Sequence, residues 1–233
     1  VDLQAWTKVD KAGLEAIVRR STENITKTMA AMPADVAAAV RAELVRGYAA
    51  GTNPRATAAR IIRRTEGRFN GGLQSALRVS RTETLDASRA GARIGRMENA
   101  DVLQGWAWHC ELSTRSCTAC ISMDGQIFPI ETPGPDDHVS GRCTGVPVTK
   151  SWADLGIYGV DEPPSVRVDG PEWFDSLDAG TQKQILGPGK YDAWTSGRYP
   201  MSDWSTMRHN DGWRDSLQTT PIPAQSGGRR AAS

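Results

Sequence analysis

Cys117-Thr118-Ala119-Cys120 and His138-Val139-Ser140-Gly141-Arg142-Cys143 decide the fold of this 233-residue chain. The C-x2-C pair presents two thiolates to one metal ion, and the His-x4-Cys pair follows after 17 intervening residues. The turn signals Asp124-Gly125 and Pro133-Gly134-Pro135 lie between the two pairs and allow them to meet. The pattern therefore predicts a closed, structural zinc site with the ligands Cys117, Cys120, His138 and Cys143.

The clustering of the four cysteines limits the roles that they can have. All four fall within 34 residues, and four are too few for a disulfide-dense secreted scaffold of this length. Reduced core cysteines with an unrelated histidine, or disulfides, are the alternatives to a zinc site. A thioredoxin-like redox pair is disfavoured, because no βαβ pattern surrounds Cys117. Cys110, next to His109, is expected to be a small buried residue or an alternative ligand.

The remaining sequence predicts an α+β fold. A composition dominated by Ala, Arg, Glu and Leu predicts helices at about 4–30, 33–50, 54–67 and 72–99. Short runs of Trp, Ile, Val and Phe predict strands near 104–109, 121–123, 126–130 and 144–148. Short helices are expected at about 171–186, 189–196 and 202–208.

These elements divide the chain into three expected segments. Residues 1–72 form a helical N-terminal arm. Residues 73–208 hold the small zinc-clipped β-hairpin core and the short C-terminal helices. Residues 209–233 end in a stretch rich in Pro, Gly and Ser and are expected to be a disordered tail.

The two halves of the chain carry opposite charge. Residues 1–100 hold 17 Lys and Arg against 10 Asp and Glu, whereas residues 101–233 hold 11 against 17. The halves therefore face different partners, or each other, and the basic half raises the expectation of an anionic partner. No run of 18 or more apolar residues occurs, so neither a membrane-spanning helix nor a membrane partner is expected.

A stripe of arginines runs along the helix expected at 72–99. At 100° per residue its members fall within an arc of about 120°. They are Arg78, Arg81, Arg89, Arg93 and Arg96. Such a face predicts non-specific contact with the phosphate backbone of double-stranded DNA, without base stacking, because no aromatic residues are interleaved. A solvated helix face, or arginines that pair with the acidic second half, are the alternatives.

Motifs of enzyme catalysis are absent from the sequence. It contains three histidines and no G-x-S-x-G, Walker loop, H-E-x-x-H or dinucleotide fingerprint. Asp136-Asp137-His138 is compatible with a metal-dependent nuclease or a toxin fragment, because acids beside a histidine can hold a hard cation. A polar loop is the simpler interpretation, and the sequence predicts a protein that is not an enzyme.

Four groups of motifs follow one another along residues 73–207 in a characteristic order. They are Arg81-Thr82-Glu83 in a long helix; Trp108 with Cys117-Thr118-Ala119-Cys120 and Met123-Asp124-Gly125-Gln126-Ile127-Phe128; Pro135-Asp136-Asp137-His138 through Gly141-Arg142-Cys143; and Gln184-Ile185-Leu186-Gly187 with Tyr191 and Trp194-Thr195-Ser196-Gly197. This order resembles the phage head morphogenesis family named for the Mu minor head protein F. In the third group the spacing is longer by two than in the family, and Thr144-Gly145 replaces the last cysteine.

The resemblance implies a low-copy minor head protein that is not an enzyme. It implies association with the portal protein, entry into the procapsid with it, and a role in genome packaging or ejection. The major capsid protein and a scaffolding protein are further candidate partners. The resemblance places the protein in the virion, in the head interior or portal region, and in the host cytoplasm during assembly. A zinc-containing, non-specific DNA-binding protein is the alternative.

The N-terminal helices are the expected contact with the portal. An apolar stripe along residues 3–25 has few large residues elsewhere to cover it, and such a helix needs a partner surface. The stripe consists of Leu3, Trp6, Leu14, Ile17, Val18 and Ile25. A helical hairpin with residues 33–50 is the alternative way to cover it.

Overall fold

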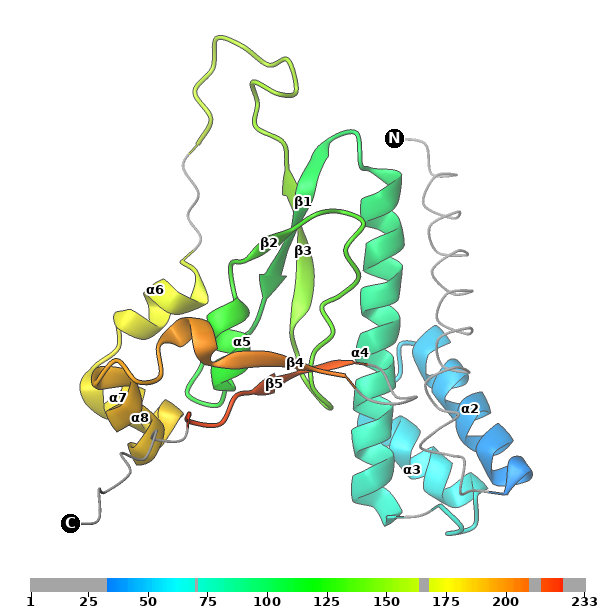
Figure 1. The fold of residues 1–233 in the computed structure, drawn as a ribbon. Coiled ribbons are helices and arrows are strands. Elements are labelled where there is room, and N and C mark those ends of the chain that lie inside the picture. Colours follow the sequence, from blue (N-terminus) through cyan, green and yellow to red (C-terminus); the bar gives the residue numbers. More distant parts are fainter. Residues whose placement is uncertain (1–32, 70, 164–167, 210–214, 224–233) are drawn as a thin grey trace, which may run out of the picture.

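The computed structural model describes residues 33–69, 71–163, 168–209 and 215–223, and its fold is mixed α+β (Figure 1). Its helices are α2 (Ala34–Ala49), α3 (Pro54–Arg64), α4 (Gly72–Glu98), α5 (Thr118–Met123), α6 (Gly170–Asp175), α7 (Ala179–Leu186), α8 (Pro188–Thr195) and the 3-10 helix η1 (Met201–Asp203). Its strands are β1 (Leu103–His109), β2 (Ile127–Phe128), β3 (Thr144–Thr149), β4 (Ser205–Arg208) and β5 (Ser216–Thr219). The helix expected at 4–30, with its apolar stripe, lies outside the described residues. Within the described ranges, no helix combines the length and apolarity needed to cross a bilayer.

The helices α2 and α3 pack on the N-terminal half of α4 around a small apolar core. This core includes Val40, Leu44, Ile61, Phe69 and Ala76. The side chain of Asn53 accepts a hydrogen bond from Arg55 N at 2.8 Å, which caps the start of α3. Gly47 allows α2 to approach α3 closely, because a Cβ at this position would lie 2.4 Å from Thr57 Oγ1. The helices expected between residues 33 and 99 are confirmed.

A three-stranded antiparallel sheet, in the order β2-β1-β3, lies beside the C-terminal half of α4 (Figure 1). Trp106 of β1 is paired with Phe128 of β2 and with Pro147 of β3. The Trp106 and Phe128 rings stack with their centroids 4.7 Å apart. Three of the expected strands are therefore confirmed, and they form a sheet whose face is covered by aromatic side chains.

The strand expected at 121–123 is wrong, because these residues belong to helix α5. Cys117 caps this helix: its Sγ atom accepts a hydrogen bond from Cys120 N at 3.3 Å. Ile121 is fully buried and packs in the same cluster as Phe174. A short apolar run suits a strand and a buried helix equally, and here the cap decides for the helix.

The C-terminal elements surround an aromatic cluster. Its ring-bearing members include Phe174, Trp194, Tyr199 and Trp204. The single helix expected at 171–186 is broken into α6 and α7, since Asp178 caps a new helix by accepting from Thr181 N at 3.0 Å. The helix expected at 189–196 is confirmed as α8. The helix expected at 202–208 is wrong, because only η1 is helical and residues 205–208 pair with β5.

The expected disordered tail is corrected where the structure describes it. Residues 216–219 form β5, and Leu217 of this strand is buried against the cysteine-bearing core. Leu217 N also donates a hydrogen bond to Asp136 O at 2.8 Å. The tail therefore contributes a strand that packs against the loop carrying His138, and the burial of Leu217 is the physical reason for its order.

Candidate metal centre

The first half of the candidate site is the N-terminus of α5. Cys117 and Cys120 lie one turn apart on this helix, and their Sγ atoms are 3.0 Å apart. Cys120 is buried, and Cys117 is partly exposed. Because the backbone N–H of Cys120 points at Cys117 Sγ, the cap itself stabilises a thiolate at that sulfur.

The second half of the site is the loop that leads into β3. His138 Nε2 lies 3.5 Å from Cys120 Sγ, and His138 Nδ1 lies 3.1 Å from Val139 O. A proton on Nδ1 that is donated to this carbonyl leaves Nε2 free to bind a metal. The candidate ligand atoms form two overlapping trios, Cys117 with Cys120 and His138, and Cys120 with Asp137 and Cys143, each within 4.8 Å.

All four ligands predicted from the sequence therefore belong to one cluster, with Cys120 common to both trios. Thiolate and imidazole donors are the set that zinc prefers, whereas a hard cation such as magnesium prefers oxygen donors. The residues present fit a zinc ion, and this fit rests on the donor chemistry and on the burial of Cys120 and Cys143.

The sequence placed Asp137 only in a polar loop or a nuclease-like group, and the structure gives it a different role in this site. It is completely buried, and its Oδ1 accepts from His138 N at 2.7 Å while its Oδ2 accepts from Cys143 N at 3.0 Å. Oδ1 also lies 3.6 Å from Cys120 Sγ. The carboxylate therefore ties both ends of the His138–Cys143 loop to one point. Its position directly before His138 was visible in the sequence, but an acidic residue in a polar loop gives no sign of burial.

Arg89 of α4 balances the buried charge of Asp137. Its Nη2 lies 3.3 Å from Asp137 Oδ2, and its Nη1 lies 2.8 Å from Asp86 Oδ1. Arg89 also donates to the carbonyl oxygens of Cys143 at 2.8 Å and Gly141 at 3.0 Å. With 5% of its side chain exposed, Arg89 holds the His138–Cys143 loop against α4.

The prediction that Arg89 and Arg96 contact DNA is therefore wrong. Arg96 is also buried: it donates to Gly145 O and Gly134 O, both at 3.3 Å, and lies 5.2 Å from the centre of the Trp106 ring. Both guanidinium groups donate hydrogen bonds to backbone carbonyl oxygens of β3 and of the loop before it, which satisfies these buried acceptors. The stripe thus pairs with the second half of the chain, which was the stated alternative.

The rest of the stripe faces outward. Arg78 and Arg81 are exposed, and Arg93 is partly exposed and donates to Glu131 O at 3.2 Å. The five arginines therefore lie on one helix as predicted, but those near the start of α4 are exposed and Arg89 and Arg96 are buried.

Cys110 completes the sulfur cluster from the end of β1. It is buried, and its backbone N–H donates to Asp124 Oδ1 at 2.7 Å. Together with Cys117, Cys120, His138 and Cys143 it lines a cavity of about 180 Å³. Arg142 and Glu111, which form an ion pair, also line this cavity.

The thiols of the cluster differ strongly in acidity. A hydrogen bond with the Cys120 thiol, with help from His138, lowers the pKa of Cys117 to about 5. Hydrogen bonds with the Cys110 and Cys120 thiols lower the pKa of Cys143 to about 5. The hydrogen bond with Cys117 raises the pKa of His138 to about 9, and the pKa values of Cys110 and Cys120 are raised. Two sulfurs are therefore already thiolates at neutral pH.

No family model, curated protein or solved structure matches the chain. The donor chemistry of the cluster is therefore the main guide to the role of this site.

Gly141→Ala is expected to disrupt the His138–Cys143 loop. A Cβ at Gly141 would lie 1.9 Å from Asp137 Oδ2, so the buried carboxylate would have to move and release its hydrogen bonds to the loop. Leaving such groups unpaired costs about 1–3 kcal/mol each. We expect a lower unfolding temperature and a weaker hold on the metal.

Gly91→Ala and Gly95→Ala are the matched controls for this glycine. Nothing lies within 4 Å of a Cβ at either helical position, so each change should raise stability by about 0.5–1 kcal/mol through helix propensity. Equal unfolding temperatures for Gly141→Ala and Gly91→Ala in thermal melts would contradict the close packing against Asp137.

Proposed function

We propose that this chain is a non-enzymatic minor head protein of a phage, similar to the Mu F-like proteins, whose core is stabilised by one zinc ion. The observation that carries this proposal is the meeting of Cys117–Cys120 with His138–Cys143 in one cluster. These are the stretches on which the resemblance to the phage family rests.

The zinc ion in this proposal is structural. Cys117, Cys120, His138 and Cys143 would hold it, and Asp137 and Arg89 would position the loop that carries His138 and Cys143. Four protein ligands leave no open position for a substrate, so the ion clips α5 to the loop before β3. This role favours the zinc-clipped core over a nuclease built on Asp136, Asp137 and His138, because both Asp137 oxygens already accept hydrogen bonds from backbone N–H groups.

The partner in this proposal is the portal protein, with the major capsid or scaffolding protein as further candidates. The test is to express the tagged full chain during infection by its own phage and to sediment the procapsids. The chain should co-sediment with procapsids that contain the portal and not with procapsids assembled without it. Absence of the chain from both kinds of particle would reject the proposed function.

Zinc binding to this site is expected to release protons, since a metal ligand must be deprotonated. Cys117 and Cys143, with pKa values of about 5, are already deprotonated at pH 7 and can bind the metal without losing a proton. His138, with a pKa of about 9, must lose a proton first. The raised pKa of Cys120 adds a second proton. The affinity for zinc should therefore rise with pH between about 5 and 9. Below about pH 5 it should fall more steeply, because Cys117 and Cys143 also take up protons there.

The measurement is isothermal titration calorimetry with zinc at pH 7 in two buffers of different ionisation enthalpy. We expect about two protons released per zinc bound. No proton release, or an affinity that does not change between pH 6 and 8, would contradict the ligand set.

Non-specific DNA binding remains a proposal for the exposed part of α4, which carries Arg78 and Arg81. Each phosphate contact contributes about −0.9 to the slope of log affinity against log salt on duplex DNA. Arg78→Ala with Arg81→Ala should therefore make this slope less steep by about 1.8 for every sequence tested. An unchanged slope in fluorescence anisotropy titrations would exclude this surface, and Arg198→Ala, an exposed arginine near the C-terminal helices, serves as the control.

A further inference from the structure

Residues 150–163, between β3 and α6, form a loop that extends away from the sheet (Figure 1). Within it, Leu155 N donates to Ser151 O at 3.0 Å, and Trp152 N donates to Glu162 Oε2 at 3.2 Å. The second bond joins the two ends of the loop, as in a compact surface loop that is packed by its own residues. The tip is therefore presented on a defined backbone.

The tip of this loop, residues 156–160, is apolar and exposed. Ile157, Tyr158 and Val160 are 47%, 78% and 62% exposed. Gly156 and Gly159 flank the first two with φ values of +76° and +81°, in the left-handed region that favours glycine. Large apolar side chains held in solvent by an ordered backbone are typical of a contact site.

The loop is also acidic. The loop carries three acidic side chains, Asp154, Asp161 and Glu162, against one basic side chain, Lys150, which lies at its base and donates to Asp101 O. A partner for the loop tip therefore needs an apolar surface bordered by positive charge.

Such a surface lies at the other end of the molecule, between α3 and the start of α4. Here Ala56, Ala59, Ile62 and Leu73 form a groove of about 460 Å³ together with Arg60 and Arg63. This volume is within the range of about 300–1,000 Å³ that is typical of ligand pockets. Leu73 is 44% exposed, so the groove has an apolar floor that is open to solvent.

The surroundings of this α3 groove are strongly basic. Arg46, Arg60 and Arg64 share the single buried carboxylate of Glu43, at 3.0 to 3.3 Å. One negative charge among three guanidinium groups leaves a local excess of positive charge. Arg63 adds to this excess and is exposed beside the groove.

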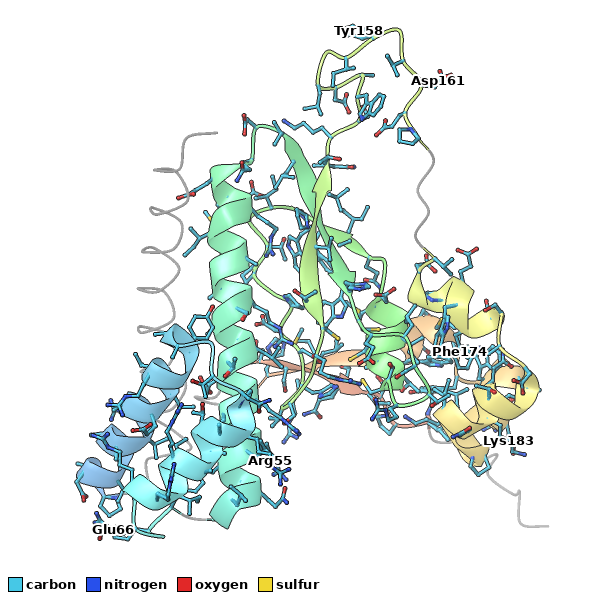
Figure 2. The ribbon with its side chains drawn as sticks, turned by 180° about the vertical axis from the view of Figure 1, so that it is seen from behind. Arg55, Glu66, Tyr158, Asp161, Phe174 and Lys183 are labelled. Carbon is cyan, nitrogen blue, oxygen red and sulfur yellow. The ribbon has the colours of Figure 1, made fainter. Side chains whose placement is uncertain are left out.

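The loop tip does not reach the groove of its own chain. Figure 2 shows Tyr158 and Asp161 at one end of the molecule, and Arg55 of α3 and Glu66, just after α3, at the other. We propose that the loop tip of one copy docks into the α3 groove of a second copy. Each copy then offers one tip and one groove, so the contact is head-to-tail and produces a closed ring or an open chain. The opposite charges of the two halves of the chain fit this arrangement.

The test uses the full chain and two variants, one for each side of the contact. Tyr158→Ser with Val160→Ser removes the apolar tip, and Arg63→Glu reverses the charge at the groove. Sedimentation velocity at rising protein concentration should show assembly of the unmodified chain, and either variant should weaken it at least about tenfold, as expected when a buried aromatic anchor or its charged neighbour is lost. Tyr158, Val160 and Arg63 are all exposed, so both variants should keep the fold, and circular dichroism checks this.

Mixing the two variants gives the sharpest result. The tip variant keeps its groove and the groove variant keeps its tip, so the mixture should form a dimer and nothing larger. Arg63→Glu should also be rescued by combination with Asp161→Arg. Met97→Ser and Arg198→Glu, which change exposed residues elsewhere, are controls that should assemble as the unmodified chain does.

Several results would overturn the proposal. One is an unmodified chain that stays monomeric at low salt and high concentration. A cross-link between residues 1–32 and the groove within such a monomer would assign the groove to the chain's own N-terminal segment. Another is assembly of both variants at the unmodified strength. A third is an Arg63→Glu variant that loses duplex DNA binding but assembles normally, which would assign the basic groove to phosphate.

Discussion

Cys120→Ser is expected to abolish metal binding and to destabilise the region around the site. Cys120 is common to both trios of candidate ligands, with its Sγ atom 3.0 Å from Cys117 Sγ and 3.5 Å from His138 Nε2. A structural zinc ion supplies about 10–16 kcal/mol of binding-linked folding free energy in small zinc domains. The variant should therefore hold almost no zinc after dialysis, and amide hydrogen exchange over residues 105–148 should become fast.

Cys110→Ser is the matched control for this experiment. Cys110 lines the same cavity, but it lies outside both trios. It should keep about one zinc per chain, as four ligands complete a structural site. A fully folded natural chain without metal would reject the zinc site. A disulfide between Cys117 and Cys120 under reducing conditions would reject it as well.

Arg89→Ala is expected to be strongly destabilising, although the sequence places this residue on a DNA-binding face. Removal of the guanidinium leaves Asp86 and Asp137, which are 1% and 0% exposed, without their shared cation. Loss of one partner from a buried ion pair costs about 3–5 kcal/mol. For a chain of this size about 2–4 °C is lost per kcal/mol, so the midpoint of thermal unfolding should fall by about 6–20 °C.

Arg81→Ala on the same helix separates this effect from a general loss of charge. Arg81 is exposed, so its removal should change stability by less than about 0.5 kcal/mol. Arg89→Ala should also bind zinc more weakly, because Asp137 and the Cys143 carbonyl lose a donor that holds the His138–Cys143 loop. Equal melting temperatures for the two variants would show that Arg89 does not anchor the loop.

The helical half of the fold was predictable from local signals. Asn53 ahead of Pro54, and the Gly71-Gly72 pair at the start of α4, mark helix boundaries that depend only on neighbouring residues. The strands around Trp106 and Phe128 were predictable from their apolar runs, which are local features, whereas the Asp124-Gly125 turn joins α5 to β2 and not two strands of a hairpin. Residues 121–123 were mispredicted because an apolar run of this length does not distinguish a strand from a buried helix.

The sequence by itself predicted which residues form the candidate metal cluster, because the spacing of thiolate and imidazole donors follows from their chemistry and needs no knowledge of the rest of the chain. It also determined that the arginines of α4 share a face, because that follows from the helical period. Only the tertiary structure decided which of these arginines meet solvent. Arg89 finds the Cys143 carbonyl 54 residues away and Asp137 48 residues away. Such pairings depend on how the loop before β3 packs on α4, and burial of opposite charges leaves no periodic signal in the sequence.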